Sequence, residues 1–163
     1  MDWLVRNLAT LGFIGKKLPA PGTFGSLLGT IFFLIILCSS SFSNLEISIL
    51  FSFLFVLGIP LTSRAELILK KVDPSEVIWD EFTAIPFVYI FCLDKLKTFP
   101  NMDSIVLLSL GFLLFRIFDI LKPFGIKRIQ KLHGGLGIMI DDLVAALFSA
   151  LILLFIGTFP LSF

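Results

Sequence analysis

The sequence predicts an all-α integral membrane protein, a polytopic bundle of about four to five membrane-embedded helices with a short interfacial helix at its N-terminus. Of the 163 residues, 57% are hydrophobic and only 15% are charged, whereas soluble chains have roughly a quarter charged residues. Five apolar stretches approach the roughly 20 residues that cross a bilayer. The basic residues are also divided unevenly among the segments that join these stretches.

The expected elements follow one another along a single domain, residues 1–163. The N-terminal segment has apolar residues at helical spacing, which predicts a helix lying on the membrane surface, although a plainly packed helix fits equally well; these residues are Trp3, Leu4, Leu8 and Leu11. The five predicted spans are residues 26–42, 47–62, 77–93, 104–121 and 143–163. Pro86 lies inside the third span, which is therefore expected to be kinked or re-entrant.

Charge placement predicts the orientation of these spans. With the N-terminus in the cytoplasm, eleven of the 13 basic residues lie on the cytoplasmic side, and only Lys95 and Lys97 lie outside. This division follows the positive-inside tendency. The formal net charge is only +1, so the chain has no overall field that attracts a polyanion, and no nucleic-acid partner is expected.

Acidic residues gather at the ends of the apolar stretches on the predicted cytoplasmic side. They are Asp73, Glu76, Asp80, Glu81, Asp119, Asp141 and Asp142. The run 73–76 is typical of a helix start with Asp73 as its cap. Residues 77–84 and 138–145 resemble each other, because both carry adjacent acids in an apolar run. The two acid pairs are therefore expected to face each other.

Carboxylates beside apolar helices are unfavourable unless they are paired or bind a metal. Hard oxygen ligands favour Mg²⁺ over softer metals, so a magnesium site is the leading interpretation. The alternative is that acids at helix N-termini simply interact with the helix dipole. The chain has one histidine, His133, which is interpreted as a loop residue, and a zinc site is not expected.

Two further patterns suit phosphate binding. Arg116, Asp119 and Lys122 lie at the end of the fourth span; the arginine fork and the lysine charge suit phosphate oxygens, although both side chains could instead reach lipid headgroups. A glycine-containing turn, residues 19–26, precedes the first span and can present N–H groups to an anion, or serve only as a turn and cap. A second glycine-rich stretch, residues 134–137, can admit a ligand close to the backbone.

Four segments of the chain together resemble the phosphatidylglycerophosphatase A family. They are residues 18–27, 73–81, 115–123 and 134–142, in the family's order. The resemblance implies a Mg²⁺-dependent phosphatase that removes the terminal phosphate of phosphatidylglycerophosphate to yield phosphatidylglycerol. It also implies a bacterial inner membrane location, an active site on the cytoplasmic face and an anionic phospholipid as the partner.

For this reaction, the expected catalytic residues are Asp80, Glu81, Asp141 and Asp142. The expected metal ligands are these four and Asp119, and the expected phosphate-binding residues are Gly22, Thr23, Gly25, Ser26, Arg116 and Lys122. The attacking group, the number of metal ions, the acyl-chain preference and the oligomeric state are left open. Alternative functions are a small transporter, a noncatalytic assembly protein or a lipid-headgroup transferase. Charges are missing from the span centres, which disfavours transport.

Overall fold

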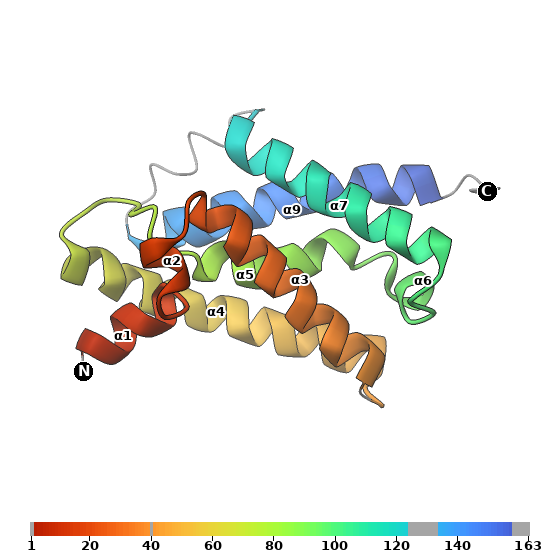
Figure 1. Cartoon of the computed structure of the whole chain (residues 1–163), viewed down its shortest axis with the longest axis horizontal. Coiled ribbons are helices and arrows are strands. Elements are labelled where there is room, and N and C mark those ends of the chain that lie inside the picture. Colours follow the sequence, from red (N-terminus) through yellow and green to blue (C-terminus); the bar gives the residue numbers. More distant parts are fainter. Residues whose placement is uncertain (1, 40, 124–133, 158–163) are drawn as a thin grey trace.

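The computed structural model describes residues 2–39, 41–123 and 134–157. Within these ranges, four helices are long and apolar enough to cross a membrane: α3 (Pro21–Ser39), α4 (Asn44–Leu69), α7 (Met102–Leu121) and α9 (Gly135–Gly157). Figure 1 shows these helices arranged as one bundle, with shorter helices between them and at one end. The predicted all-α membrane bundle is confirmed.

The shorter elements are α1 (Asp2–Ala9), α2 (Ile14–Lys17), α5 (Trp79–Ala84), the 3-10 helix η1 (Ile85–Tyr89) and α6 (Leu93–Leu96). The predicted N-terminal helix is thus present as α1. Its buried Ala9 packs against Ala65 of α4 and Val77, while Trp3 is exposed. The helix is therefore anchored to the bundle by one face, and its position on a membrane surface stays a prediction.

All four membrane helices begin earlier than the sequence pattern predicts, and α3 and α9 differ most. Helix α3 begins at Pro21 rather than at residue 26, because proline is well suited to the first helical position. Residues 22–26 are therefore helical and do not form a turn before the helix. Helix α9 begins at Gly135 rather than at residue 143, where the Gly135 N–H donates to Ser63 Oγ at 2.7 Å. The apolar pattern alone misses these glycine-containing first turns.

The third predicted span is not one continuous helix. Residues 79–89 form α5 and η1, and Figure 1 shows this segment passing through the middle of the bundle, from the end where α4 finishes to the end where α7 begins. Ile85, Pro86, Val88 and Tyr89 are all buried. Irregular backbone is tolerated at membrane depth where protein surrounds it, so the bundle accommodates the break at Pro86.

The predicted helix start at Asp73 is wrong. The helix begins at Trp79, and Ile78 is its N-cap residue without a side-chain cap. Asp73 has a left-handed backbone with φ of 47°, whereas an N-cap residue needs an extended backbone. Residues 73–77 instead form a loop that leads into α5.

Helix α5 is held by close packing against α3. A Cβ on Gly25 would lie 3.0 Å from the Ile78 Cβ, and one on Gly29 would overlap the Phe82 carbonyl oxygen. Deeper in the core, the rings of Phe33 and Tyr89 stack with centroids 5.6 Å apart. These contacts hold the first turn of α5, which carries two acids, against the start of α3.

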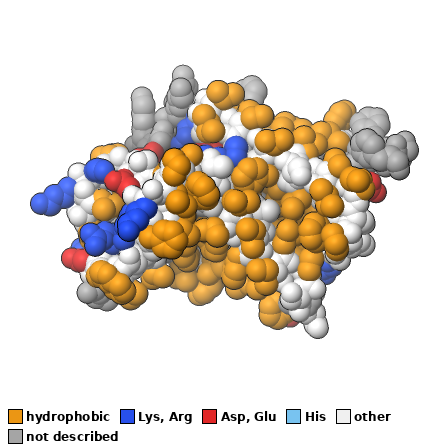
Figure 2. Space-filling view, viewed as in Figure 1, with side chains coloured by type: hydrophobic (Ala, Val, Ile, Leu, Met, Phe, Trp, Pro, Cys, Tyr) orange, Lys and Arg blue, Asp and Glu red, His pale blue; other side chains and the backbone are white. Residues whose placement is uncertain are grey.

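Charged and apolar surfaces are separated along the molecule. Figure 2 shows hydrophobic side chains over the middle of the visible face, with most of the visible Lys and Arg side chains toward one end. At that end α3, α5 and α9 begin and α4 and α7 finish (Figure 1). The predicted cytoplasmic segments thus share one end of the bundle. His133 lies outside the described residues, as do Lys127, Arg128 and Lys131, three of the eleven basic residues counted on the cytoplasmic side.

Candidate active site

A polar cavity of about 290 Å³ lies at this end of the bundle. The first turn of α3, the loop 73–77, the first turn of α5, the end of α7 and the second turn of α9 all contribute to its wall. The charged residues that line it are Asp73, Asp80, Glu81, Arg116, Asp119, Lys122, Asp141 and Asp142. Residues more than sixty positions apart in the chain therefore meet in one site.

Three acids form a compact group inside the cavity. Asp80, Glu81 and Asp142 each offer one carboxylate oxygen, and these oxygens all lie within 4.8 Å of one another. The buried atoms Asp80 Oδ1, Glu81 Oε2 and Asp142 Oδ2 have no hydrogen-bond partner among the described residues. A buried carboxylate oxygen without a partner is unfavourable. The group therefore fits a bound cation, and its all-oxygen donors suit a hard ion such as Mg²⁺.

The two α5 acids lie in a buried and like-charged environment. Asp80 and Asp142 are buried, and the oxygen that each offers lies within 4.8 Å of one from Glu81. Carboxylates this close repel one another more strongly when they are buried than they would in water. A positive charge placed beside these groups stabilises their ionised forms. The electrostatics of the site thus favour a cation among these acids.

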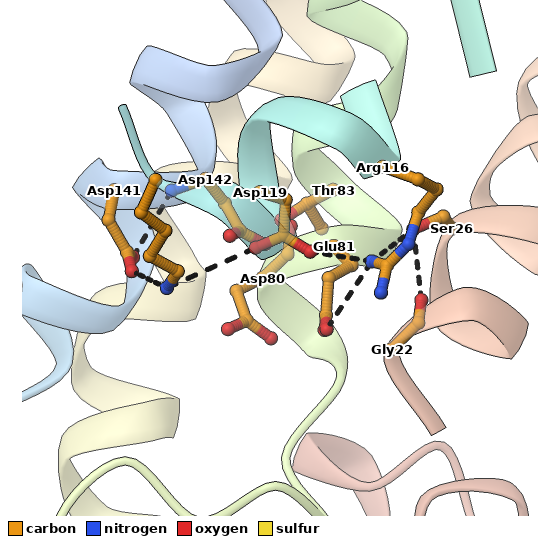
Figure 3. Close-up of polar contacts among 10 residues, drawn as sticks. Gly22, Ser26, Asp80, Glu81, Thr83, Arg116, Asp119, Asp141 and Asp142 are labelled. Carbon is orange, nitrogen blue, oxygen red and sulfur yellow. Dashed lines mark hydrogen bonds and ion pairs between the residues drawn. The ribbon is translucent and has the colours of Figure 1, made fainter. Parts of the chain in front are cut away.

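Arg116 links three of the elements that form the site. Its Nη1 atom lies 2.7 Å from Asp119 Oδ2 and 3.9 Å from Glu81 Oε1. The same atom donates a hydrogen bond to Ser26 Oγ at 3.2 Å, and Figure 3 shows the guanidinium between Asp119 and the α3 side of the site. Ser26 Oγ in turn donates to the Gly22 carbonyl oxygen at 2.9 Å. Arg116 is therefore oriented by contacts with α3, α5 and its own helix.

Lys122 provides the second cation at the C-terminal end of α7. Its Nζ pairs with Asp141 Oδ2 and lies 4.0 Å from Asp119 Oδ1. Lys122 has a left-handed backbone with φ of 45°, which ends the helix and turns the chain. Asp119 and Asp141 therefore have basic partners. In contrast, Asp80, Glu81 and Asp142 each keep one oxygen without a partner among the described residues.

The predicted site residues separate into those that line the cavity and those that do not. All five predicted metal ligands, both predicted basic residues and Gly22 line it. A Cβ on Gly22 would overlap Glu81 Oε1, so a larger residue there would displace the Glu81 carboxylate. Ser26 contacts Arg116 from α3. Thr23 and Gly25 are not among the lining residues, and Gly25 packs on Ile78. The chemical roles of all these residues stay predictions.

Sequence reasoning missed part of the cavity wall. Asp73, interpreted as a helix cap, lines the cavity with Pro74 and Ser75. The backbone N–H of Asp73 donates to Glu66 Oε1 at 2.8 Å, which ties this loop to α4. The signal that could have placed Asp73 in the site is its position, next to Pro74, in the segment 73–81 that resembles the family. The helix-dipole alternative also fails for Asp141 and Asp142, because the first turn of α9 contains no acid.

A membrane bundle with clustered acids and two cations in one cavity is suited to bind a metal ion and a phosphate, as an integral membrane phosphatase does. The chain matches the model of the phosphatidylglycerophosphatase A family over residues 7–157, and it belongs to that family. No solved structure matches the chain.

Three curated relatives align with most of the chain. It is 38% identical to the phosphatidylglycerophosphatase A of Haemophilus influenzae, with 90% of this chain and 85% of the relative covered. It is 33% identical to the Escherichia coli protein of that name, with 93% and 83% covered. A Bacteroides thetaiotaomicron relative, provisionally named a phosphatidylinositol-3-phosphatase, is 31% identical, with 82% and 81% covered. The relatives' names therefore include two different lipid substrates.

Proposed function

We propose that the protein hydrolyses the terminal phosphomonoester of phosphatidylglycerophosphate to phosphatidylglycerol and phosphate, with Mg²⁺ as its cofactor. One observation carries the proposal: the carboxylates of Asp80, Glu81 and Asp142, with their unpartnered oxygens, lie in the same cavity as Arg116 and Lys122. The names of the two phosphatidylglycerophosphatase A relatives support the choice of lipid.

In this proposal the two cations bind the phosphate oxygens. Arg116 provides planar N–H donors that suit a phosphate, and Lys122 adds a compact positive charge. Asp119 and Asp141 orient these cations through the ion pairs described above. Because the side chains are mostly buried, their attraction for an anion is stronger than it would be in water. The site can therefore bind and orient a phosphomonoester before reaction.

The acids supply the other half of the proposed chemistry. Asp80, Glu81 and Asp142 would hold Mg²⁺. Asp119 and Asp141 line the same cavity outside this group of three. Mg²⁺, when bound, supplies positive charge to the phosphate oxygens as negative charge develops on them. One of the cavity acids accepts the proton of the attacking water, unless a carboxylate itself attacks phosphorus.

We also propose that the site faces the cytoplasm from the inner membrane of a bacterium. The basic residues at the site end of the bundle support this orientation through the positive-inside tendency. Lys95 and Lys97 lie in or beside α6, at the opposite end. The substrate would then be a lipid of the cytoplasmic leaflet.

Purified protein in detergent tests the reaction directly. Phosphate release from phosphatidylglycerophosphate is expected with Mg²⁺, is expected to stop with excess chelator and to return when Mg²⁺ is added back. Carboxylate sites without histidine or thiolate ligands bind such hard ions reversibly. Undiminished release in chelator, with no metal retained by elemental analysis, would contradict the metal mechanism.

The same assay with other lipids tests the substrate. Phosphatidylinositol 3-phosphate is the matched comparison, because the Bacteroides relative carries that provisional name. A preference for phosphatidylglycerophosphate is expected. Release from phosphatidylinositol 3-phosphate alone would overturn the proposed substrate. Release from neither lipid would favour the alternative functions, a transporter or an assembly protein.

A further inference from the structure

An apolar groove of about 350 Å³ lies between α3 and α7, outside the polar cavity. Its lining residues are Leu27, Thr30, Leu108, Ser109, Phe112 and Leu113. Thr30 and Ser109 are the polar residues among them, and Thr30 Oγ1 donates to the carbonyl oxygen of Ser26 at 2.8 Å. The groove therefore presents a mostly hydrocarbon surface.

The groove and the polar cavity lie at successive positions along the same two helices. On α3, Gly22 lines the cavity, Ser26 lies one turn deeper, and Leu27 begins the groove. On α7, Asp119 and Arg116 line the cavity, and Phe112 lies one turn deeper than Arg116, about 6 Å along the axis. The hydrogen bond from Arg116 to Ser26 therefore marks the boundary between the polar cavity and the apolar groove.

The groove is also open to the membrane side of the bundle. Both of its helices are long and apolar enough to cross a membrane, and Figure 2 shows hydrophobic side chains covering the face that they form. Leu27 is 44% exposed and Leu113 is 57% exposed. A ligand in this position would have an anionic end at Arg116 and a hydrocarbon part at bilayer depth.

We propose that one acyl chain of the lipid substrate lies in the α3–α7 groove, so that its phosphate reaches the cavity past the Arg116–Ser26 pair. This inference rests on the proposed function. Lipid tails are about as apolar as leucine, so the groove gains little affinity over the surrounding bilayer. Its effect is to position the headgroup, and a displacement of about 1 Å at a reacting group can lower a rate by about 10²-fold.

A second apolar groove, between α7 and α9, is the main structural rival. It contains Phe118 of α7 and Phe148 of α9. The α3–α7 groove is favoured because Arg116 points toward α3, where it contacts Ser26 (Figure 3). A phosphate bound by Arg116 is therefore on the α3 side of the cavity.

Filling the groove tests the proposal by kinetics. Ser109→Phe places a ring in the groove, and Ser52→Phe, at an exposed position of α4 that lines neither groove, is the matched control. Turnover is measured with long-chain phosphatidylglycerophosphate and with its deacylated headgroup. The ratio of kcat/KM for the acylated to the deacylated substrate is expected to fall by roughly 10- to 100-fold in Ser109→Phe and to stay unchanged in Ser52→Phe. An unchanged ratio in Ser109→Phe would overturn the inference.

Photolabelling tests occupancy without requiring turnover. The probe is phosphatidylglycerophosphate with a diazirine in one acyl chain, compared with phosphatidylcholine carrying the same group. Labelled peptides from α3 and α7 are expected with the first probe, several-fold fewer with the second, and fewer again in Ser109→Phe. Labelling mainly at α7–α9, or equal labelling by both lipids, would overturn the inference. If the parent protein labels at α3–α7 but releases no phosphate, the proposed reaction fails while the groove assignment stands.

Discussion

At the level of single residues, the acids of the cavity divide by their partners. Asp119 pairs with Arg116 and Asp141 pairs with Lys122. Asp80, Glu81 and Asp142 keep buried oxygens without partners among the described residues. The sequence indicated five of the six acids that line the cavity, because these five lie at ends of apolar stretches, and it missed Asp73. It did not separate the two groups, because the pair of Lys122 with Asp141 joins two different helices.

The unpartnered acids are expected to be the most sensitive to loss of charge. Asp80→Asn and Asp142→Asn each preserve shape and remove a carboxylate, so they are expected to lower phosphate release by about 10²- to 10⁴-fold, the usual scale of a general-base or ligand loss. Release is measured at equal amounts of folded protein, and Mg²⁺ binding is measured separately by calorimetry.

Asp103→Asn is the control for these variants. Asp103 is exposed in the first turn of α7, at the end of that helix away from the cavity. Its change to asparagine is expected to leave both activity and Mg²⁺ binding near those of the parent. Near-parent turnover in Asp80→Asn and Asp142→Asn would show that the acid group is not the reacting site.

At the level of the elements, the site depends on how closely α3 approaches α5. Gly22, Gly25 and Gly29 share one side of α3, where an added Cβ would meet or overlap atoms of the segment 78–85. This close approach brings Glu81 beside the first turn of α3. The pattern of residues 19–26 predicted a turn before the helix, either binding an anion or only capping it, because spacing alone does not reveal a packed helix face.

Gly29→Ala is expected to separate these helices. Its Cβ would overlap the Phe82 carbonyl oxygen, and such overpacking typically destabilises by about 1–3 kcal/mol. The melting temperature in detergent is expected to fall by roughly 2–4 °C for each kcal/mol, with lower phosphate release because Asp80 and Glu81 move with α5. Ser52→Ala, at an exposed position of α4, is the control, and parental stability and turnover in Gly29→Ala would contradict this packing account.

At the level of the whole molecule, the ends of α4 and α7 meet the starts of α3, α5 and α9 at one end of the bundle (Figure 1). Successive predicted spans must cross in opposite directions for these ends to meet. The broken segment α5–η1 keeps this alternation because it passes through the centre of the bundle from one end to the other. If residues 77–93 had returned to the side on which they began, α7 and α9 would cross the bundle in the opposite directions.

Side-specific labelling tests the orientation of the bundle. In a chain with Cys38 and Cys92 replaced by alanine, single cysteines at Lys17 and Lys71 are expected to react only from the cytoplasmic side, and one at Lys97 only from the opposite side. The reason is the positive-inside tendency. Reaction of the Lys17 and Lys71 positions from opposite sides would contradict the bundle, whereas a shared reversal would contradict only the orientation.

The class of fold and most of the chemistry of the site follow from the local sequence pattern. Long apolar stretches specify membrane helices, because backbone polar groups in lipid must bond within the chain. Seven of the eight charged residues of the cavity were also evident, since charged residues beside such stretches are unfavourable unless they are paired or bind a ligand. These features depend on local pattern and on the bilayer, both of which can be inferred without knowing which helices touch.

Contacts between distant residues fix where the helices begin and which carboxylate oxygens have no partner among the described residues. Gly135 starts α9 against Ser63, and Lys122 pairs with Asp141 rather than with the acids of α5. The segment 79–89 keeps a broken helix because neighbouring helices surround it. Each outcome depends on contacts between residues distant in sequence, and the free energy of such contacts is not contained in the local pattern of either partner.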